Sequence, residues 1–188
     1  MNLFKKIFGK QKSTDFVASD ALLEENKFWE IIALTLKKSN GDYELQQEEL
    51  AKELKKGSLQ DIIAFDNRFR ELMGNSYNYE LWGAIYIING GCGDDSFDYF
   101  RSWMIAQGKD FYFKTLEHPE TLIDLNRNST EIEWEGVSYV AATVFEELTD
   151  QEIPSLFIGN QEITGFDWDE DDLASIFPEL TKKYPDYY

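Results

Sequence analysis

Apolar residues recur three and four positions apart along most of the chain, and glycine or asparagine residues separate the periodic stretches. This spacing is typical of helices that bury one face, because residues three and four apart lie on the same side of an α-helix. The sequence shows neither an internal repeat nor strands that alternate with helices. It therefore predicts an all-α fold, a compact orthogonal bundle of roughly six to eight helices, with a long irregular loop near the C-terminus over residues 151–167.

Start and stop signals place the first helices. The first helix is expected to run from about Ala21 to Asn40-Gly41, with a buried face that comprises Leu22, Trp29, Ala33 and Leu36. A more polar second helix follows and ends at Gly57. Ser58 is a favourable N-cap for the third helix, and Asp61, three residues later, completes a short capping box.

The centre of the chain predicts a buried helix followed by an aromatic one. The stretch Leu81–Ile88 is apolar on almost every side, which indicates a helix surrounded by others. Asp94 or Asp95 is expected to cap the next helix. The inward face of that helix would comprise Phe97, Phe100, Trp103 and Met104.

Two further helices are expected towards the C-terminus. Thr130 and Glu133 suggest a second capping box. It would precede a regular apolar stripe formed by Val137, Val140, Ala141, Val144 and Leu148. The last helix contains Pro178, which is expected to bend it.

The charge of the chain bears on its partners. The 188 residues include 36 acidic and 18 basic ones, a formal net charge of -18. Binding to a nucleic-acid backbone depends on clustered lysine and arginine, so this charge argues against it. The charge favours a basic protein partner, or serves solubility alone.

The N-terminus differs from the rest of the chain. Residues 1–12 contain Lys5, Lys6, Lys10 and Lys12 but no acid, and Leu3, Phe4, Ile7 and Phe8 follow helical spacing. We interpret residues 1–20 as a basic amphipathic leader and linker, and residues 21–188 as a single helical domain. The leader would be a weak membrane anchor or a docking peptide, or a loose chain end.

The cysteine content suggests a cytoplasmic protein. Cys92 is the only cysteine, so the chain forms no intrachain disulfide and no cysteine-based zinc site. No transmembrane span or secretory signal is expected either. The sequence leaves the oligomeric state open.

The densest candidate site lies between Trp82 and Gly108. There a glycine-rich turn leads into a helix that carries acids, aromatic residues and an arginine, and the candidate binding residues are Trp82, Asp94, Asp95, Asp98, Arg101 and Trp103. Carboxylates beside a cation could bind a ligand or act in catalysis. Alternatively, the first two acids stabilise a helix start, and Asp98 and Arg101 form an ordinary pair one turn apart.

Other chemistries have little support. A dyad of Cys92 and the single histidine, His118, is possible, but no motif indicates it. The acidic run that starts at Asp167 resembles a calcium loop, but Asp172 replaces its turning glycine and Pro178 its closing glutamate. No nucleotide-binding or zinc-protease motif is present, so we expect neither a cofactor nor a metal.

The central motif also resembles a known family. The residues that carry the resemblance are Phe28, Trp29, Leu81, Trp82, Gly83, Ala84, Gly90, Gly91, Cys92, Gly93, Asp94, Asp95, Phe97, Tyr99, Phe100, Arg101 and Trp103. They are similar to the bacterial domain of unknown function 4240, in which serine usually occupies the position of Gly93. Trp168 and Leu173 extend the resemblance to about residues 24–180. It implies a helical domain and suggests no activity.

Three functions are compatible with these observations. The first is an uncharacterised cytoplasmic binding or interaction protein, such as an immunity-like or regulatory protein that engages a basic partner. The second is an enzyme, a hydrolase or transferase, that uses the Asp94, Asp95 and Arg101 cluster in a central pocket. The third is a peripheral membrane protein held weakly by residues 1–12.

Overall fold

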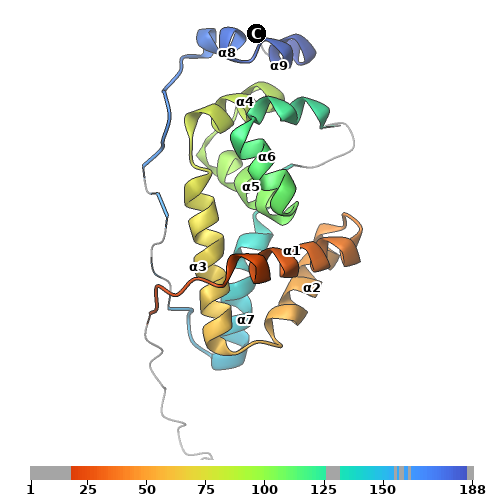
Figure 1. Ribbon diagram of the computed structural model, residues 1–188, viewed down its shortest axis with the longest axis vertical. Coiled ribbons are helices and arrows are strands. Elements are labelled where there is room, and N and C mark those ends of the chain that lie inside the picture. Colours follow the sequence, from red (N-terminus) through yellow and green to blue (C-terminus); the bar gives the residue numbers. More distant parts are fainter. Residues whose placement is uncertain (1–17, 126–131, 155, 157–158, 161, 186–188) are drawn as a thin grey trace, which may run out of the picture.

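The computed structural model describes residues 18–125, 132–154, 156, 159–160 and 162–185, which form a bundle of helices (Figure 1). The α-helices are α1 Glu25–Ser39, α2 Tyr43–Leu54, α3 Leu59–Asn75, α4 Tyr79–Asn89, α5 Asp94–Ala106, α6 Lys109–Glu117, α7 Val140–Thr149, α8 Leu173–Ile176 and α9 Pro178–Lys183. Short 3-10 helices are η2 Pro119–Asp124, η3 Gly136–Tyr139 and η4 Glu170–Asp172. These described ranges contain no strand, only an isolated bridge between Asn78 and Thr164. The predicted all-α bundle is confirmed.

Some of the helices cross at steep angles, whereas α3 and α7 run side by side (Figure 1). Figure 1 shows α1 lying across α3 at a steep angle, with α7 behind α3 and α2 beside α7. Helix α4 is enclosed, since the side chains of Leu81, Ala84, Ile85, Ile87 and Ile88 are fully buried. This confirms the central buried helix that the apolar stretch predicts. None of the described helices is long and apolar enough to cross a membrane.

Helix α1 begins later than the sequence suggests. The carboxylate of Glu24 accepts hydrogen bonds from the backbone N–H groups of Asn26 and Lys27, at 3.0 and 2.9 Å, and so caps the helix there. Its buried residues are Phe28, Trp29, Ile32, Thr35 and Ser39. The predicted face was therefore partly wrong, because Ala33 is exposed.

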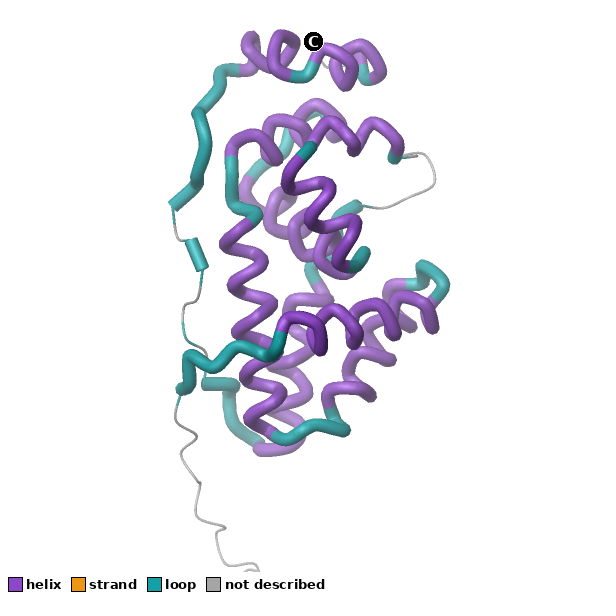
Figure 2. The backbone as a smooth tube through the Cα atoms, in the orientation of Figure 1, coloured by secondary structure: helices purple, strands orange, loops and turns teal. Residues whose placement is uncertain are grey.

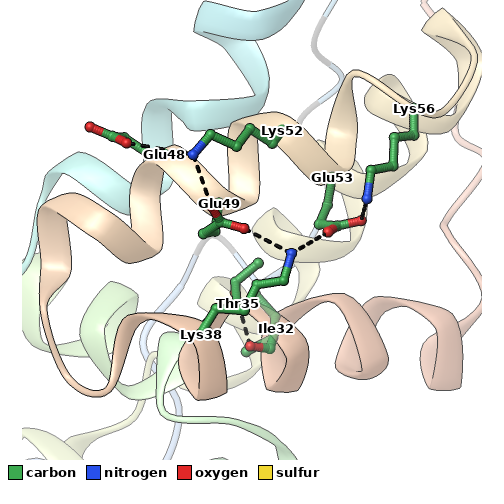
Figure 3. A network of polar contacts seen from close by, with 8 residues as sticks. All are labelled: Ile32, Thr35, Lys38, Glu48, Glu49, Lys52, Glu53 and Lys56. Carbon is green, nitrogen blue, oxygen red and sulfur yellow. Dashed lines mark hydrogen bonds and ion pairs between the residues drawn. The ribbon is translucent and has the colours of Figure 1, made fainter.

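An alternating row of charges joins α1 to α2 (Figure 3). The Lys38 ammonium lies 2.8 Å from the carboxylates of both Glu49 and Glu53. Lys52 continues the row to Glu49 at 2.8 Å, and Lys56 continues it to Glu53 at 2.5 Å. Lys38 and Lys52 together lower the pKa of Glu49 to about 2. Because solvent reaches these groups, the row of ion pairs contributes little to stability. Its lysines are paired with glutamates of the same chain.

The predicted N-caps are confirmed at α3 and corrected at α5. Ser58 and Asp61 form a capping box at the start of α3, as expected. At α5 the N-cap is Gly93, and no side chain caps the helix. Asp94 and Asp95 are its first two residues and are exposed, so they interact with the positive end of the helix dipole without capping.

The C-terminal half departs from the sequence-based expectation in three details. Thr130 lies outside the described residues, and Glu133 precedes η3, where its carboxylate accepts a hydrogen bond from the Asn89 amide at 3.0 Å. The apolar stripe of α7 is buried except for its last member, Leu148, which is 51% exposed. The last helix is divided at Pro178 into α8 and α9.

The described parts of the segment between α7 and η4 lie along one side of the bundle, beside α3 and the start of α4 (Figure 2). We call its described residues 159–160 and 162–169 the C-terminal connector. Thr164 exchanges backbone hydrogen bonds with Tyr77 and Tyr79, at 3.1 and 2.9 Å. The indole N–H of Trp168 donates to the Tyr79 carbonyl at 2.8 Å. These bonds fix the connector to the start of α4.

We expect the substitution Gly74→Ala to loosen the connector. A Cβ atom at Gly74 would lie 2.5 Å from the backbone nitrogen of Asn160 and 2.7 Å from the Cα of Gly159. Backbone atoms cannot move aside as the end of a flexible side chain can. The clash should therefore lower the free energy of unfolding by about 1–3 kcal/mol. Hydrogen exchange at the Thr164 amide, which bonds to Tyr77, should become faster.

A matched control is Gly93→Ala. A Cβ atom there would have no other atom within 4 Å, and the backbone of Gly93 has an ordinary φ of -78. This variant should leave exchange at Thr164 unchanged. Unchanged exchange in Gly74→Ala would show that the connector does not depend on this close approach.

Candidate functional site

A cavity among the described residues lies between α3, α5, η3 and the C-terminal connector. Its volume is about 440 Å³. Phe69 and Met73 supply apolar surface, and Asn160 of the connector supplies one edge. The charged and aromatic residues of its wall are Arg70, Tyr77, Asp94, Asp98, Arg101 and Tyr139. This mixture of apolar surface and a few polar groups is typical of ligand sites.

Arg101 forms part of the wall, and the fold engages both of its Nη atoms, whereas its buried Nε has no hydrogen-bond partner among the described residues. It is only 6% exposed, and its guanidinium lies 4.7 Å from the ring centre of Tyr77 and 4.8 Å from that of Phe97. One Nη donates to the Met73 carbonyl at 2.5 Å, and the other pairs with Asp98. Burial lowers the pKa of Arg101, whereas Asp98 raises it. Arg101 is therefore better suited to hold Asp98 in place than to bind an anion.

The second cation of the wall is also paired. The Nε of Arg70 donates to Asp66 at 2.6 Å, and the side chain of Asp66 is 3% exposed. By contrast, no cation among the described residues forms an ion pair with Asp94. Asp94 and Asp98 lie one turn apart on α5, and both face the cavity. The unpaired charge on the wall is thus negative.

Two further acids lie beside the cavity, and we call Asp95 and Glu135 the acidic rim. Glu135 accepts a hydrogen bond from the Tyr139 hydroxyl at 3.2 Å and thereby raises the pKa of Tyr139. The pKa of Tyr99 is raised by burial first and then by Glu135 and Asp95. Glu135 thus adds a carboxylate next to a wall residue, Tyr139, and Asp95 follows Asp94 on α5.

The structure separates the two tryptophans of the predicted site from its charged residues. Trp82 is half-buried and stacks on Phe97 at 4.9 Å, and its indole N–H donates to the Cys92 carbonyl at 2.8 Å. Trp103 is 1% exposed, and its indole N–H donates to the Tyr43 hydroxyl at 2.6 Å. Trp82 supports the cavity through Phe97, whereas Trp103 belongs to the core. Of the candidate residues, Asp94, Asp98 and Arg101 meet at the cavity.

Neither Cys92 nor His118 lies on the cavity wall. Burial raises the pKa of the Cys92 thiol to about 12, so the thiol is protonated at neutral pH and a poor nucleophile. The His118 side chain is 58% exposed, at the end of α6. Within the part of the chain that the structure describes, no group of three or more His, Cys, Asp and Glu side chains is arranged to hold a metal ion.

Most of the cavity wall was not among the predicted site residues, which include only Asp94, Asp98 and Arg101 of it. Arg70, Tyr77, Tyr139 and Asn160 come from a helix face, an interhelical turn, a 3-10 helix and the connector. The four-residue spacing of Asp66 and Arg70 could have indicated an ion pair on α3. The other three carry no local signal, because tertiary packing alone brings them to α5.

A family model described as "Protein of unknown function (DUF4240)" matches residues 23–147. The chain belongs to the DUF4240 family. The match confirms the resemblance to this family over α1–α6 and most of α7, and it ends before Trp168 and Leu173. The DUF4240 region supplies every wall residue of the cavity except Asn160, which lies beyond it on the connector. No curated protein and no solved structure matches the chain.

Proposed function

We propose that the chain is a cytoplasmic binding protein whose cavity on α5 accepts a lysine or arginine side chain of a basic protein partner. The observation that supports this most is the charge of the cavity wall. Both of its arginines are paired with acids of the fold, while Asp94 is left without an ion-pair partner among the described residues. An incoming cation could form an ion pair with Asp94 without breaking the ion pairs of Arg70 or Arg101.

The surroundings of Asp94 support the same partner. The acidic rim adds two carboxylates where a basic surface would approach, and the formal net charge of -18 would speed the encounter. The exposed ring of Tyr139, which is 56% accessible, offers an aromatic face for a cation. Phe69 and Met73 would contact the aliphatic part of a lysine or arginine side chain.

Binding is better supported than catalysis. The enzyme hypothesis requires Asp94, Asp95 and Arg101 to converge in one pocket, and Asp95 lies outside the cavity wall. The hydroxyl of Ser138, on the same wall, donates to the backbone carbonyl of Glu135 at 2.7 Å. The Ser138 hydroxyl thus donates to a carbonyl and not to a base that would activate it as a nucleophile.

The substitution Asp94→Lys is expected to weaken binding of a synthetic oligolysine peptide by about tenfold or more, since it places a like charge in the cavity. Asp94→Asn, which removes the charge without adding another, should have a smaller effect in the same direction. Isothermal titration calorimetry at fixed low salt measures both affinities. Because Asp94 is exposed, neither change should unfold the protein.

Glu117→Lys is the matched control. The Glu117 side chain is 77% exposed at the end of α6 and is no part of the cavity wall, yet its replacement changes the net charge equally. If Glu117→Lys weakens the peptide as much as Asp94→Lys, binding reflects overall charge and not the cavity, and the proposal fails.

A further inference from the structure

A second concave surface, which we call the α2–α7 groove, lies away from the α5 cavity. Its volume is about 380 Å³. Ala51, Val140 and Val144 supply its apolar lining, and Glu44, Glu48 and Glu147 supply its acids. The exposed Leu148 is one turn beyond Val144 on α7 and extends the apolar surface past the groove.

The acids of the groove are only partly neutralised. Lys55 pairs with Glu147 at 2.6 Å, and Lys52 approaches Glu48 at 3.6 Å while also binding Glu49 at 2.8 Å. No described cation forms an ion pair with Glu44. The groove thus combines an apolar base with a net negative border, and it fits a short segment whose apolar residues alternate with cations.

One segment of this chain has that composition. Residues 1–12, whose structure is not described, contain four lysines, no acid and the large apolar residues Leu3, Phe4, Ile7 and Phe8. We propose that residues 1–12 dock into the α2–α7 groove of the same chain. In the sequence Leu3 and Ile7, and likewise Phe4 and Phe8, are four positions apart, and Lys5 and Lys6 between them carry the charge that complements the glutamates.

The place where the described chain begins makes this docking intramolecular. The Asn67 amide donates to the carbonyls of Ser19 and Ala21, at 2.6 and 3.0 Å, and so fixes the start of the described chain on α3. Helix α3 packs directly on α7, which forms one side of the groove. Residues 13–17 can extend by about 3.4 Å each. A short tether that spans the distance between two sites gives an effective concentration in the millimolar range, so a weak interface within reach of it would be occupied.

Carbodiimide cross-linking of the full chain tests this proposal. The reagent joins an ammonium group to a carboxylate in contact with it, and mass spectrometry identifies the linked residues. We expect links from Lys5, Lys6 or Lys10 to Glu44, Glu48 or Glu147, in the monomer and at a yield that does not depend on protein concentration. Links found mainly in a covalent dimer would show that a second copy is the occupant and would overturn the proposal.

Charge variants of the full chain separate docking from random encounter. Reversing Glu44 and Glu48 to lysine should reduce the yield of links to the remaining Glu147 at least fivefold, whereas Glu117→Lys should leave it unchanged. Links distributed over exposed acids such as Glu117 as often as over the groove would contradict the proposal. An equal yield of links to Glu147 in the Glu44 and Glu48 double variant and in Glu117→Lys would contradict it as well. Asp94→Lys should not affect the links, so this test does not depend on the proposed function of the α5 cavity.

Discussion

Replacing Trp103 by alanine is expected to lower the free energy of unfolding by about 3–5 kcal/mol. The indole is 1% exposed, and its ring centre lies 5.7 Å from that of Phe100 and 5.3 Å from that of Phe111. Truncation would leave a cavity among helices that cannot close around it, and it would leave the Tyr43 hydroxyl without the indole donor. Urea denaturation followed by circular dichroism measures the loss.

The variant Trp103→Phe divides this loss into two parts. It retains an aromatic ring in the core but removes the hydrogen bond to Tyr43, so it should cost about 1–2 kcal/mol, less than alanine. Both variants should bind the oligolysine peptide normally under conditions where they are folded. A Trp103→Ala protein with unchanged stability and lost peptide binding would instead make Trp103 a binding residue, as the sequence first suggested.

The helices could be predicted from sequence because their signals are local. The capping box of Ser58 and Asp61 and the enclosed apolar run at Leu81–Ile88 each depend on residues a few positions apart. The start of α1 was misplaced because Glu24, an unusual cap, fixes it through backbone hydrogen bonds. At α5 the N-cap is Gly93, and Asp94 and Asp95 follow it. Acids are common both at the N-cap and in the first turn, so the sequence does not reveal this difference of one position.

The candidate site was harder to predict because it depends on packing between distant segments. Residues on one face of α5, such as Asp98 and Arg101, could be grouped by their spacing. The same spacing correctly predicted that Trp103 faces the core, although the sequence also grouped it with the candidate site. The sequence could not show that Tyr139 completes the cavity from another element. The free carboxylate of Asp94 became apparent only after the partners of both arginines were known.

Arg101→Met is expected to lower the free energy of unfolding by about 2–4 kcal/mol. Methionine can fill much of the space between the rings of Tyr77 and Phe97, but it offers no cation to either ring. It also leaves the Met73 carbonyl without its donor at a partly buried position. Arg101→Lys should recover only part of the loss, because an ammonium group cannot stack between two rings and reach two acceptors as a planar guanidinium does.

Asp98→Asn shows which partner of Arg101 matters for stability. The Asp98 side chain is 58% exposed, so an exposed ion pair of this kind should contribute about 1 kcal/mol or less. If Asp98→Asn and Arg101→Met destabilise the protein equally, the ion pair and not the ring contacts holds Arg101 in place. If Arg101→Met leaves stability unchanged but abolishes peptide binding, Arg101 contacts the partner directly. The expected order of losses, Arg101→Met well above Asp98→Asn, follows if the ring contacts and the bond to the Met73 carbonyl, more than the exposed ion pair, hold Arg101 in the cavity wall.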